Sequence, residues 1–194
     1  MEKQPPEERA VKGTMVLDIV KTIHGLKDQP WDQFLSPEAQ ALCKQKILPS
    51  TWYPFDPAIN CLNAVYRLLG GNKPENAKAW GRVNGRRVFE NVYKSLIVPG
   101  NAKESLKKLN VIAGAFVKGG RYEIRELGER HMQAEIFDED PRTEVIYYFI
   151  QGWIEVIIEI TDGKKSEVTI VQRHWEGHDS TILDARWGLG TSAK

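Results

Sequence analysis

The spacing of apolar residues changes once along the chain, near residue 119. Before that point apolar residues recur every three or four positions, which is typical of helices that bury one face. Ser36 and Pro37 mark one helix start, because serine caps helices and proline suits the first helical position. The predicted helices cover residues 14–26, 36–48, 56–70, 72–97 and 103–120.

Beyond residue 119 the pattern alternates between apolar and polar positions, which predicts strands with one buried face. The predicted strands are 121–127, 129–139, 166–175 and 180–187, and a long helix covers 142–160. This β-β-α-β-β ending with short turns predicts an α+β fold in which N-terminal helices pack with a four-stranded antiparallel sheet. We expect a flexible N-terminal arm over residues 1–12 and a single α+β domain over 13–190, mainly helical over 13–118 and β-β-α-β-β over 119–190.

The last two strands are expected to form a hairpin. Alternation predicts that Val168 lies opposite Trp187 and that Ile170 lies opposite Ala185, which gives one continuous apolar face. The same register places His174 opposite a threonine at the turn end of that face.

The turn of this hairpin reads "HWEGHD", and its histidines raise the question of a metal site. Alternation directs His174 and Glu176 to the same side, whereas His178 lies in the turn and no cysteine is near. Zinc sites normally need three or four converging ligands. We therefore interpret the stretch as a hairpin turn, with an ion site as the alternative.

The long helix at 142–160 is apolar nearly all round, so it must be buried on two sides. One side can rest on the sheet, and the other needs the N-terminal helices, a ligand cavity or a second subunit. Gly152 in its middle permits close approach by another element. Gly81 and Gly85, four residues apart in an earlier helix, likewise predict a close helix crossing.

Composition excludes several function classes. The 194 residues include 27 Lys+Arg and 26 Asp+Glu, so a net charge of +1 gives no basic stripe for nucleic acid. Cys43 and Cys61 form no C-x-x-C pattern, which favours a reduced pair in a cytoplasmic protein. We expect no secretory signal and no membrane span. A nucleophile elbow is absent, and "GRVNGRR" lacks phosphate-loop spacing, so we predict that the protein is not an enzyme.

The stretches "IQGWIEVIIEITDG" and "HWEGHDSTILDARWG" resemble the end of 4-vinyl reductase-type ligand-binding domains. Those domains are related to trafficking-complex subunits and to haem nitric-oxide-binding domains. Between about residues 40 and 188, through "ILPSTWYP" and "AWGRVNGR", the chain also resembles a myxobacterial paralogous family of unknown function. The resemblance implies a bacterial ligand-binding fold whose relatives commonly dimerise through helices.

The chain departs from these relatives where they bind metal or haem. The hairpin lacks the cysteines of zinc-containing 4-vinyl reductase-type domains, and only His174 stands near such a position. Haem nitric-oxide-binding domains carry a tyrosine–serine–arginine signature and a proximal histidine. Here "YEIRE" from Tyr122 has Ile124 where serine belongs, and no histidine lies between His24 and His131. The resemblance also implies that Cys61 could be acylated, as a cysteine is in some of the trafficking relatives. We interpret Cys61 instead as a residue of the core.

These observations favour a non-enzymatic binding or sensory module for a small hydrophobic ligand. The alternative is a structural or interaction protein that acts as a homodimer or a partner-binding scaffold without a ligand. We expect no cofactor and no metal, with no nucleic acid as a partner. The predicted ligand-binding residues are Trp52, Tyr53, Trp80, Phe149 and Trp153.

Overall fold

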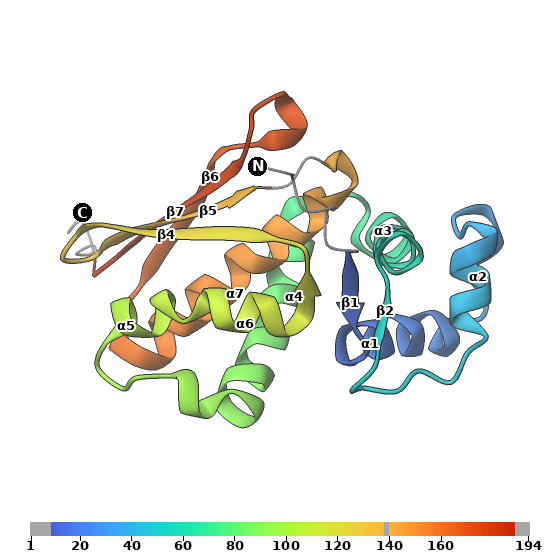
Figure 1. Ribbon diagram of the computed structural model, residues 1–194, viewed down its shortest axis with the longest axis horizontal. Coiled ribbons are helices and arrows are strands. Elements are labelled where there is room, and N and C mark those ends of the chain that lie inside the picture. The colour runs from blue at the N-terminus through green and yellow to red at the C-terminus, as the bar shows by residue number, and fades with distance from the viewer. Residues whose placement is uncertain (1–8, 138–139, 189–194) are drawn as a thin grey trace, which may run out of the picture. The chain divides into compact units, whose positions relative to one another are not determined.

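The structure is a computed structural model that describes residues 9–137 and 140–188 (Figure 1). The chain forms two compact units. The N-terminal unit comprises Met1–Lys73 and Ile112–Gly120, and the C-terminal unit comprises Pro74–Val111 and Arg121–Lys194. The α+β class and the four-stranded antiparallel sheet agree with the sequence prediction. Within the part of the chain that is described, no helix is long and apolar enough to cross a membrane.

The N-terminal unit holds three complete helices, most of a fourth that begins in the C-terminal unit, and a small antiparallel sheet of order β2-β1-β3. Its elements are β1 (Ala10–Lys12), α1 (Gly13–Gly25), a 3₁₀ turn (Trp31–Gln33), α2 (Pro37–Cys43), β2 (Trp52–Pro54), α3 (Phe55–Gly70) and β3 (Val117–Lys118). The Ser36 hydroxyl accepts from Ala39 N at 3.2 Å, which confirms the predicted cap of α2. Past α3, Gly71 takes a left-handed φ of 58°, which ends the helix.

The small sheet was not anticipated from the sequence. Strand β1 starts at Ala10, inside the stretch expected to be an arm, while residues 1–8 lie outside the described part of the chain. Val11 pairs with Tyr53 on one side and Val117 on the other, and both Val11 and Tyr53 are buried. The strands are only two or three residues long, which is too short for alternation to reveal.

The C-terminal unit is built on the sheet β4-β5-β7-β6. Its strands are β4 (Arg121–Gly128), β5 (His131–Phe137), β6 (Ser166–Gln172) and β7 (Thr181–Trp187). Its helices are α4 (Pro74–Arg87), a π-helical turn (Val88–Val92), a 3₁₀ turn (Lys94–Leu96), α5 (Ala102–Lys107), a 3₁₀ turn (Pro141–Thr143) and α7 (Glu144–Asp162). Helix α6 (Leu109–Phe116) ends among residues of the N-terminal unit.

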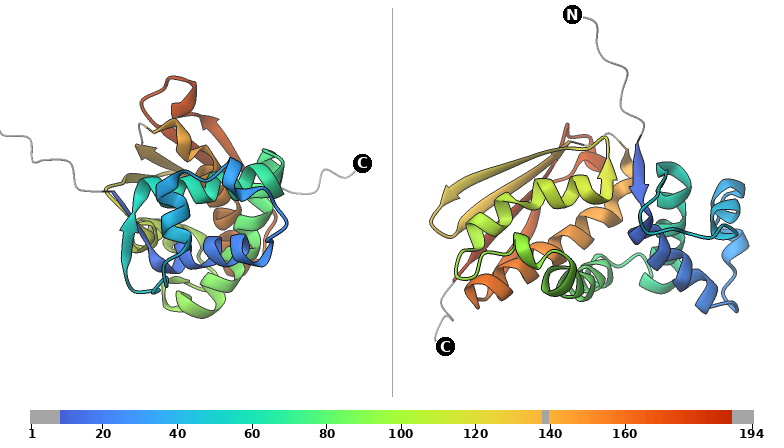
Figure 2. Two further views of the ribbon diagram at one scale, coloured as in Figure 1. Left: turned by 90° about the vertical axis from the view of Figure 1, so that its right-hand side faces the viewer. Right: turned by 60° about the horizontal axis from the view of Figure 1, so that its bottom comes forward.

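Helix α7 lies along one face of this sheet, as the orange helix and the yellow-to-red strands show in Figure 2. The sheet buries Met132, Leu183 and Val168 there, each worth roughly 1.5–3 kcal/mol of hydrophobic stabilisation. Two polar contacts tie the helix to the strands. The Gln151 amide donates to the Val168 carbonyl, and Trp187 Nε1 donates to Asp162 Oδ2 at 2.8 Å.

The register of the last hairpin differs from the prediction by two residues. Val168 lies opposite Ala185 and Ile170 lies opposite Leu183, so the predicted pairs with Trp187 and Ala185 are wrong. The buried face is nevertheless the predicted one, because a shift of two residues preserves side-chain direction. The cause is a wider connection than expected, with a 3₁₀ turn at His174–Glu176 and an irregularity after Ile170.

Helices α4 and α7 cross in close contact, as Gly81, Gly85 and Gly152 predicted. A Cβ added to Gly81 would lie 2.1 Å from the Phe149 carbonyl oxygen, and one on Gly85 would lie 2.9 Å from the Trp153 ring. The second side of α7 is therefore covered here by a helix of the same chain.

Candidate functional site

Three of the five predicted ligand-binding residues lie on the crossing helices of the C-terminal unit. Trp153 on α7 is buried, and its ring centroid lies 5.7 Å from that of Phe149 and 5.3 Å from that of Phe89. We call Phe89, Phe149 and Trp153 the aromatic cluster. Trp80 is half-buried on α4, next to the Gly81 that touches the Phe149 backbone.

Sequence reasoning missed Phe89 as a member of the aromatic cluster. It follows Gly85 by four residues, so its side chain extends along the same face of the helical segment, towards Trp153. Asn84 adds a polar contact at this point, because its Oδ1 accepts from Trp153 Nε1 at 3.2 Å. The cluster thus combines a large apolar surface with a single satisfied polar group, and Phe149 is half-exposed at its edge.

The other two predicted residues, Trp52 and Tyr53, lie on β2 of the N-terminal unit. Tyr53 is buried, and its hydroxyl accepts from Leu48 N at 2.8 Å, so it holds the loop before β2. Trp52 points to the opposite side of the small sheet. The ammonium groups of Lys12 and Lys118 lie 4.6 and 4.8 Å from its ring centroid, a distance typical of cation–π contacts.

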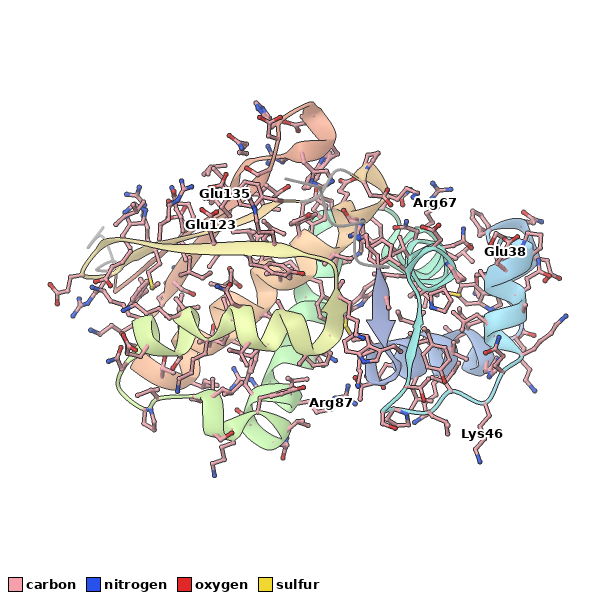
Figure 3. All side chains as sticks on the ribbon, viewed as in Figure 1. Glu38, Lys46, Arg67, Arg87, Glu123 and Glu135 are labelled. Atoms are coloured by element: carbon pink, nitrogen blue, oxygen red, sulfur yellow. The ribbon has the colours of Figure 1, made fainter. Side chains whose placement is uncertain are left out.

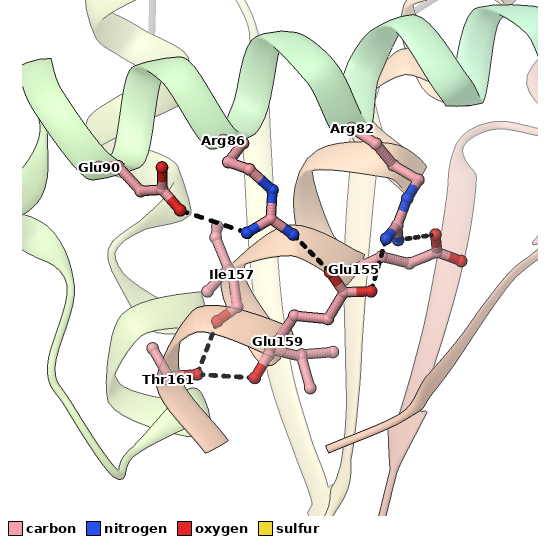
Figure 4. Close-up of polar contacts among 8 residues, drawn as sticks. Arg82, Arg86, Glu90, Glu155, Ile157, Glu159 and Thr161 are labelled. Atoms are coloured by element: carbon pink, nitrogen blue, oxygen red, sulfur yellow. Dashed lines mark hydrogen bonds and ion pairs between the residues drawn. The ribbon is translucent and has the colours of Figure 1, made fainter. Parts of the chain in front are cut away.

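A line of ion pairs joins α4 to α7 (Figure 4). Glu155 on α7 is buried, and its carboxylate lies 2.5 Å from Lys78 Nζ and 2.7 Å from Arg82 Nη1. Glu159, one turn further, accepts from Arg82 at 2.6 Å and from Arg86 at 3.0 Å. The hydrogen bond that Arg82 donates to Glu159, then the one it donates to Glu155, raises the pKa of Arg82 above its ordinary value although burial opposes this.

These pairs account for two of the three arginines of "GRVNGRR", Arg82 and Arg86. Because Arg82 and Arg86 are engaged by carboxylates of α7, they are not a cluster of free cations for a phosphate. The basic residues of α4 and the acidic residues of α7 repeat at intervals of four, which places each row along a single helix face. The network supports the glycine-mediated crossing.

A second polar cluster covers the sheet face that points away from α7. Asp184 on β7 accepts hydrogen bonds from Gln133 at 2.8 Å and Arg186 at 2.9 Å, and His131 Nε2 lies 2.6 Å from its Oδ1. Burial of the carboxyl tends to raise the pKa of Asp184, but the hydrogen bonds from His131, Gln133 and Arg186 outweigh it, so the pKa is lowered.

Two glutamates stand directly opposite each other on this face (Figure 3). Glu123 on β4 pairs with Glu135 on β5, and like charges in this position repel. Arg125 lies between them, 2.5 Å from Glu135 Oε2 and 3.3 Å from Glu123 Oε2. The Ser180 hydroxyl donates to Glu135 Oε1 at 2.6 Å. The positive charge of Arg125 thus offsets the repulsion between the two glutamates.

His174, the buried histidine of "HWEGHD", has a structural role. Its Nε2 lies 2.9 Å from the Asp140 carbonyl oxygen, which can only accept, so Nε2 carries a proton. Its Nδ1 lies 2.8 Å from the Thr181 hydroxyl. His174 therefore joins the β6–β7 connection to the start of α7.

Glu176 and His178 are exposed and do not converge with His174. Among residues 9–137 and 140–188, no three His, Cys, Asp or Glu side chains are grouped so that they could hold a metal ion. The stretch is the turn of the hairpin, as its sequence favoured.

Comparison with known proteins identifies the fold as that of H-NOX, or haem nitric-oxide/oxygen-binding, proteins. An H-NOX protein from K. algicida, solved as Fe(II) unliganded, gives a TM-score of 0.67 at 8% identity over 94% of this chain and 100% of that chain. A structure solved to probe haem distortion in the H-NOX family gives 0.65 at 17% identity, covering 94% and 98%. A Cs H-NOX mutant that carries an unnatural cyano-phenylalanine gives 0.59 at 17% identity, covering 94% and 100%. No family model and no curated protein sequence matches the chain.

The histidines and cysteines of this chain are not placed to bind haem iron. Protein ligands of haem iron are chiefly histidine, cysteine, methionine or tyrosine. Helices α2 to α7 contain no histidine, and both ring nitrogens of His174 are engaged. His131 contacts Asp184 through Nε2, and the two cysteine sulfurs contact each other. His24 and His178 are exposed. The fold is present without a buried imidazole that is available to iron.

Proposed function

We propose that the protein is a non-enzymatic sensory module that binds a small hydrophobic ligand without a bond from the protein to iron. The observation that carries this proposal is the match to H-NOX structures over nearly the whole of both chains. Those structures are described as an Fe(II) protein and as a probe of haem distortion, so the fold accommodates a large, flat and mostly apolar molecule. Because the histidines and cysteines of this chain are not placed to bind iron, we propose an organic ligand in place of haem.

The aromatic residues support this proposal. We propose that Trp80, Phe149 and Trp153 of the C-terminal unit contact the ligand, because aromatic side chains bind apolar molecules through large contact areas. Trp52 and Tyr53 of the N-terminal unit are proposed as ligand contacts on the same ground.

We further propose a bacterial, cytoplasmic member of the 4-vinyl reductase-type group, in the myxobacterial family that the sequence resembles. Trafficking-complex subunits and H-NOX proteins would then be its more distant relatives.

Native mass spectrometry of the purified protein tests ligand binding directly. We expect a mass above that of the 194-residue chain under gentle conditions, which disappears when the protein is unfolded. In the Phe149→Ala variant a smaller fraction of the protein should carry the added mass. In Val92→Ala, which changes an exposed position, that fraction should stay the same. A bare chain in both conditions would contradict the proposal.

A titration with haem distinguishes a protein that binds an organic ligand from one that binds haem iron. We expect no shift of the haem absorption band towards that of an iron–histidine complex, because helices α2 to α7 supply no histidine. A saturable, one-to-one spectral shift that survives in His174→Ala and in His131→Ala would establish haem binding through another residue and overturn our assignment.

A second candidate is an interaction protein that acts as a homodimer or a partner-binding scaffold. Val83 on α4 is 75% exposed and Val92 in the following turn is 70% exposed, which is high for valine side chains. Sedimentation velocity would test the dimer. A dimer that Val83→Lys dissociates, in a protein without a bound ligand, would favour this second function over the first.

A further inference from the structure

The two cysteines of the chain meet inside the N-terminal unit. Cys43 ends α2 and Cys61 lies within α3, and their Sγ atoms are 3.7 Å apart. Both side chains are buried, with exposed fractions of 6% for Cys43 and 0% for Cys61. Sulfurs at this distance are in contact, and the length of a disulfide bond is about 2.05 Å. Only a small movement separates the dithiol from a covalent crosslink.

The position of α2 against α3 is held close to the thiols. The Asn60 side chain, adjacent to Cys61, accepts from Ser36 N at 2.9 Å, which anchors the start of α2. Ser36 in turn caps the same helix, and Ala39 and Leu42 bury their side chains. The packing of α2 on α3 therefore holds the two sulfurs in contact.

The two thiols differ in chemistry. The Cys61 sulfur lies within reach of two acceptors, Cys43 Sγ at 3.7 Å and the Ala39 carbonyl at 3.8 Å. The hydrogen bond from Cys61 lowers the pKa of Cys43 below its ordinary value. The same hydrogen bond, and then burial, raises the pKa of Cys61. Cys43 is also the less buried of the two thiols and lies next to the exposed end of α2, so we assign Cys43 as the member that reacts first.

We propose that Cys43 and Cys61 form a reversible oxidation site for hydroperoxides, in which Cys43 reacts first and Cys61 resolves the product. The Cys43 thiolate attacks one oxygen of the peroxide, the O–O bond breaks, and sulfenic acid and hydroxide form. The Cys61 thiol then attacks the sulfenic sulfur, which forms the disulfide and releases water. Two electrons pass from the dithiol to the peroxide.

The burial of the pair selects the oxidant. Cys61 is fully buried, and Cys43 borders the exposed residues Lys44, Gln45 and Lys46 at the end of α2. A molecule as small as hydrogen peroxide needs only a small local opening of this end to reach Cys43, whereas a bulky disulfide such as oxidised glutathione needs a larger one and should react more slowly. The product links α2 to α3 across 18 positions of the sequence.

The test uses the whole reduced protein. It is treated with hydrogen peroxide, then unfolded in the presence of iodoacetamide, and its intact mass is measured. We expect two alkyl groups before oxidation and none after it, with both restored by dithiothreitol. The rate should not depend on protein concentration, because the crosslink is intramolecular. If both thiols remain open to alkylation, or if only crosslinked dimers form, the proposal is overturned.

Two matched variants test the separate roles. Cys61→Ser should leave a sulfenic acid on Cys43 that dimedone traps, while Cys43→Ser should give no trapped product on Cys61. Equal trapping in both variants would refute the order of attack. Circular dichroism checks that both variants are folded. The alkylation experiment on the wild-type protein tests the proposal even if a variant does not fold. Oxidised glutathione should oxidise the native protein at least tenfold more slowly than an equal concentration of hydrogen peroxide.

Discussion

Gly152 on α7 faces the carbonyl oxygen of Lys78 on α4, and a Cβ added to Gly152 would lie only 2.2 Å from that oxygen. Neither partner can easily move, because the contact is between two helix backbones. The absence of a side chain at Gly152 is therefore a condition of the helix crossing. The same crossing positions Trp153 and the neighbouring ion pairs.

We predict that Gly152→Ala destabilises the protein by about 1–3 kcal/mol, because the added methyl group forces α4 and α7 apart. Urea unfolding followed by circular dichroism measures the change. Gly114→Ala is the matched control, since Gly114 is also inside a helix but has open space around its Cα. There the substitution should stabilise the helix by roughly 0.5–1 kcal/mol. Equal effects of the two substitutions would contradict the role of the close crossing.

A second prediction concerns the buried end of the ion network. Glu155→Ala removes the carboxylate that Lys78 and Arg82 share, and we expect a loss of about 1–3 kcal/mol, because these cations lose a charged partner at a partly buried site. Glu90→Ala is the control, since Glu90 pairs with Arg86 on an exposed surface and should contribute less than about 1 kcal/mol. Similar losses in both variants would show that burial of Glu155 is unimportant.

The helix crossing could be predicted from the sequence because its cause is local. Glycines four residues apart in a polar helix weaken that helix unless another element approaches them closely, and Gly152 interrupts a helix that is otherwise apolar. The aromatic cluster was predicted only in part. Trp153 and Phe149 stood out within α7, whereas Phe89 lies in the π-helical turn after α4, where its spacing of four residues from Gly85 is the only local signal.

Features that depend on contacts between distant segments were predicted less well. The two hairpins of the sheet follow from the β-β-α-β-β pattern, but the register of β6 with β7 depends on the length of the connection around His174. The small sheet joins Ala10–Lys12 to Trp52–Pro54 and Val117–Lys118. No local signal links three such short segments. The contact between the two cysteines has the same character, because it arises from the packing of α2 on α3.

The pH dependence of stability should show the effect of Asp184. Its pKa in the folded protein is lowered, while that of an unfolded aspartate is about 3.9. The carboxylate therefore adds stability that is fully present above the unfolded pKa and is lost as the pH falls through the folded pKa. We expect Asp184→Asn to be less stable than the wild type at neutral pH and to lose less stability on acidification. Asp179→Asn, in the exposed turn, should follow the wild type throughout.

His174 gives the last prediction. His174→Ala removes a buried ring that bonds the Asp140 carbonyl and the Thr181 hydroxyl, and should cost about 2–4 kcal/mol. Since these bonds join the β6–β7 connection to the start of α7, amide hydrogen exchange should accelerate there first and leave α3 unchanged. His178→Ala, four residues away in the exposed turn, should alter neither stability nor exchange. If the two variants behaved alike, the buried histidine would not be the residue that fixes this end of the hairpin.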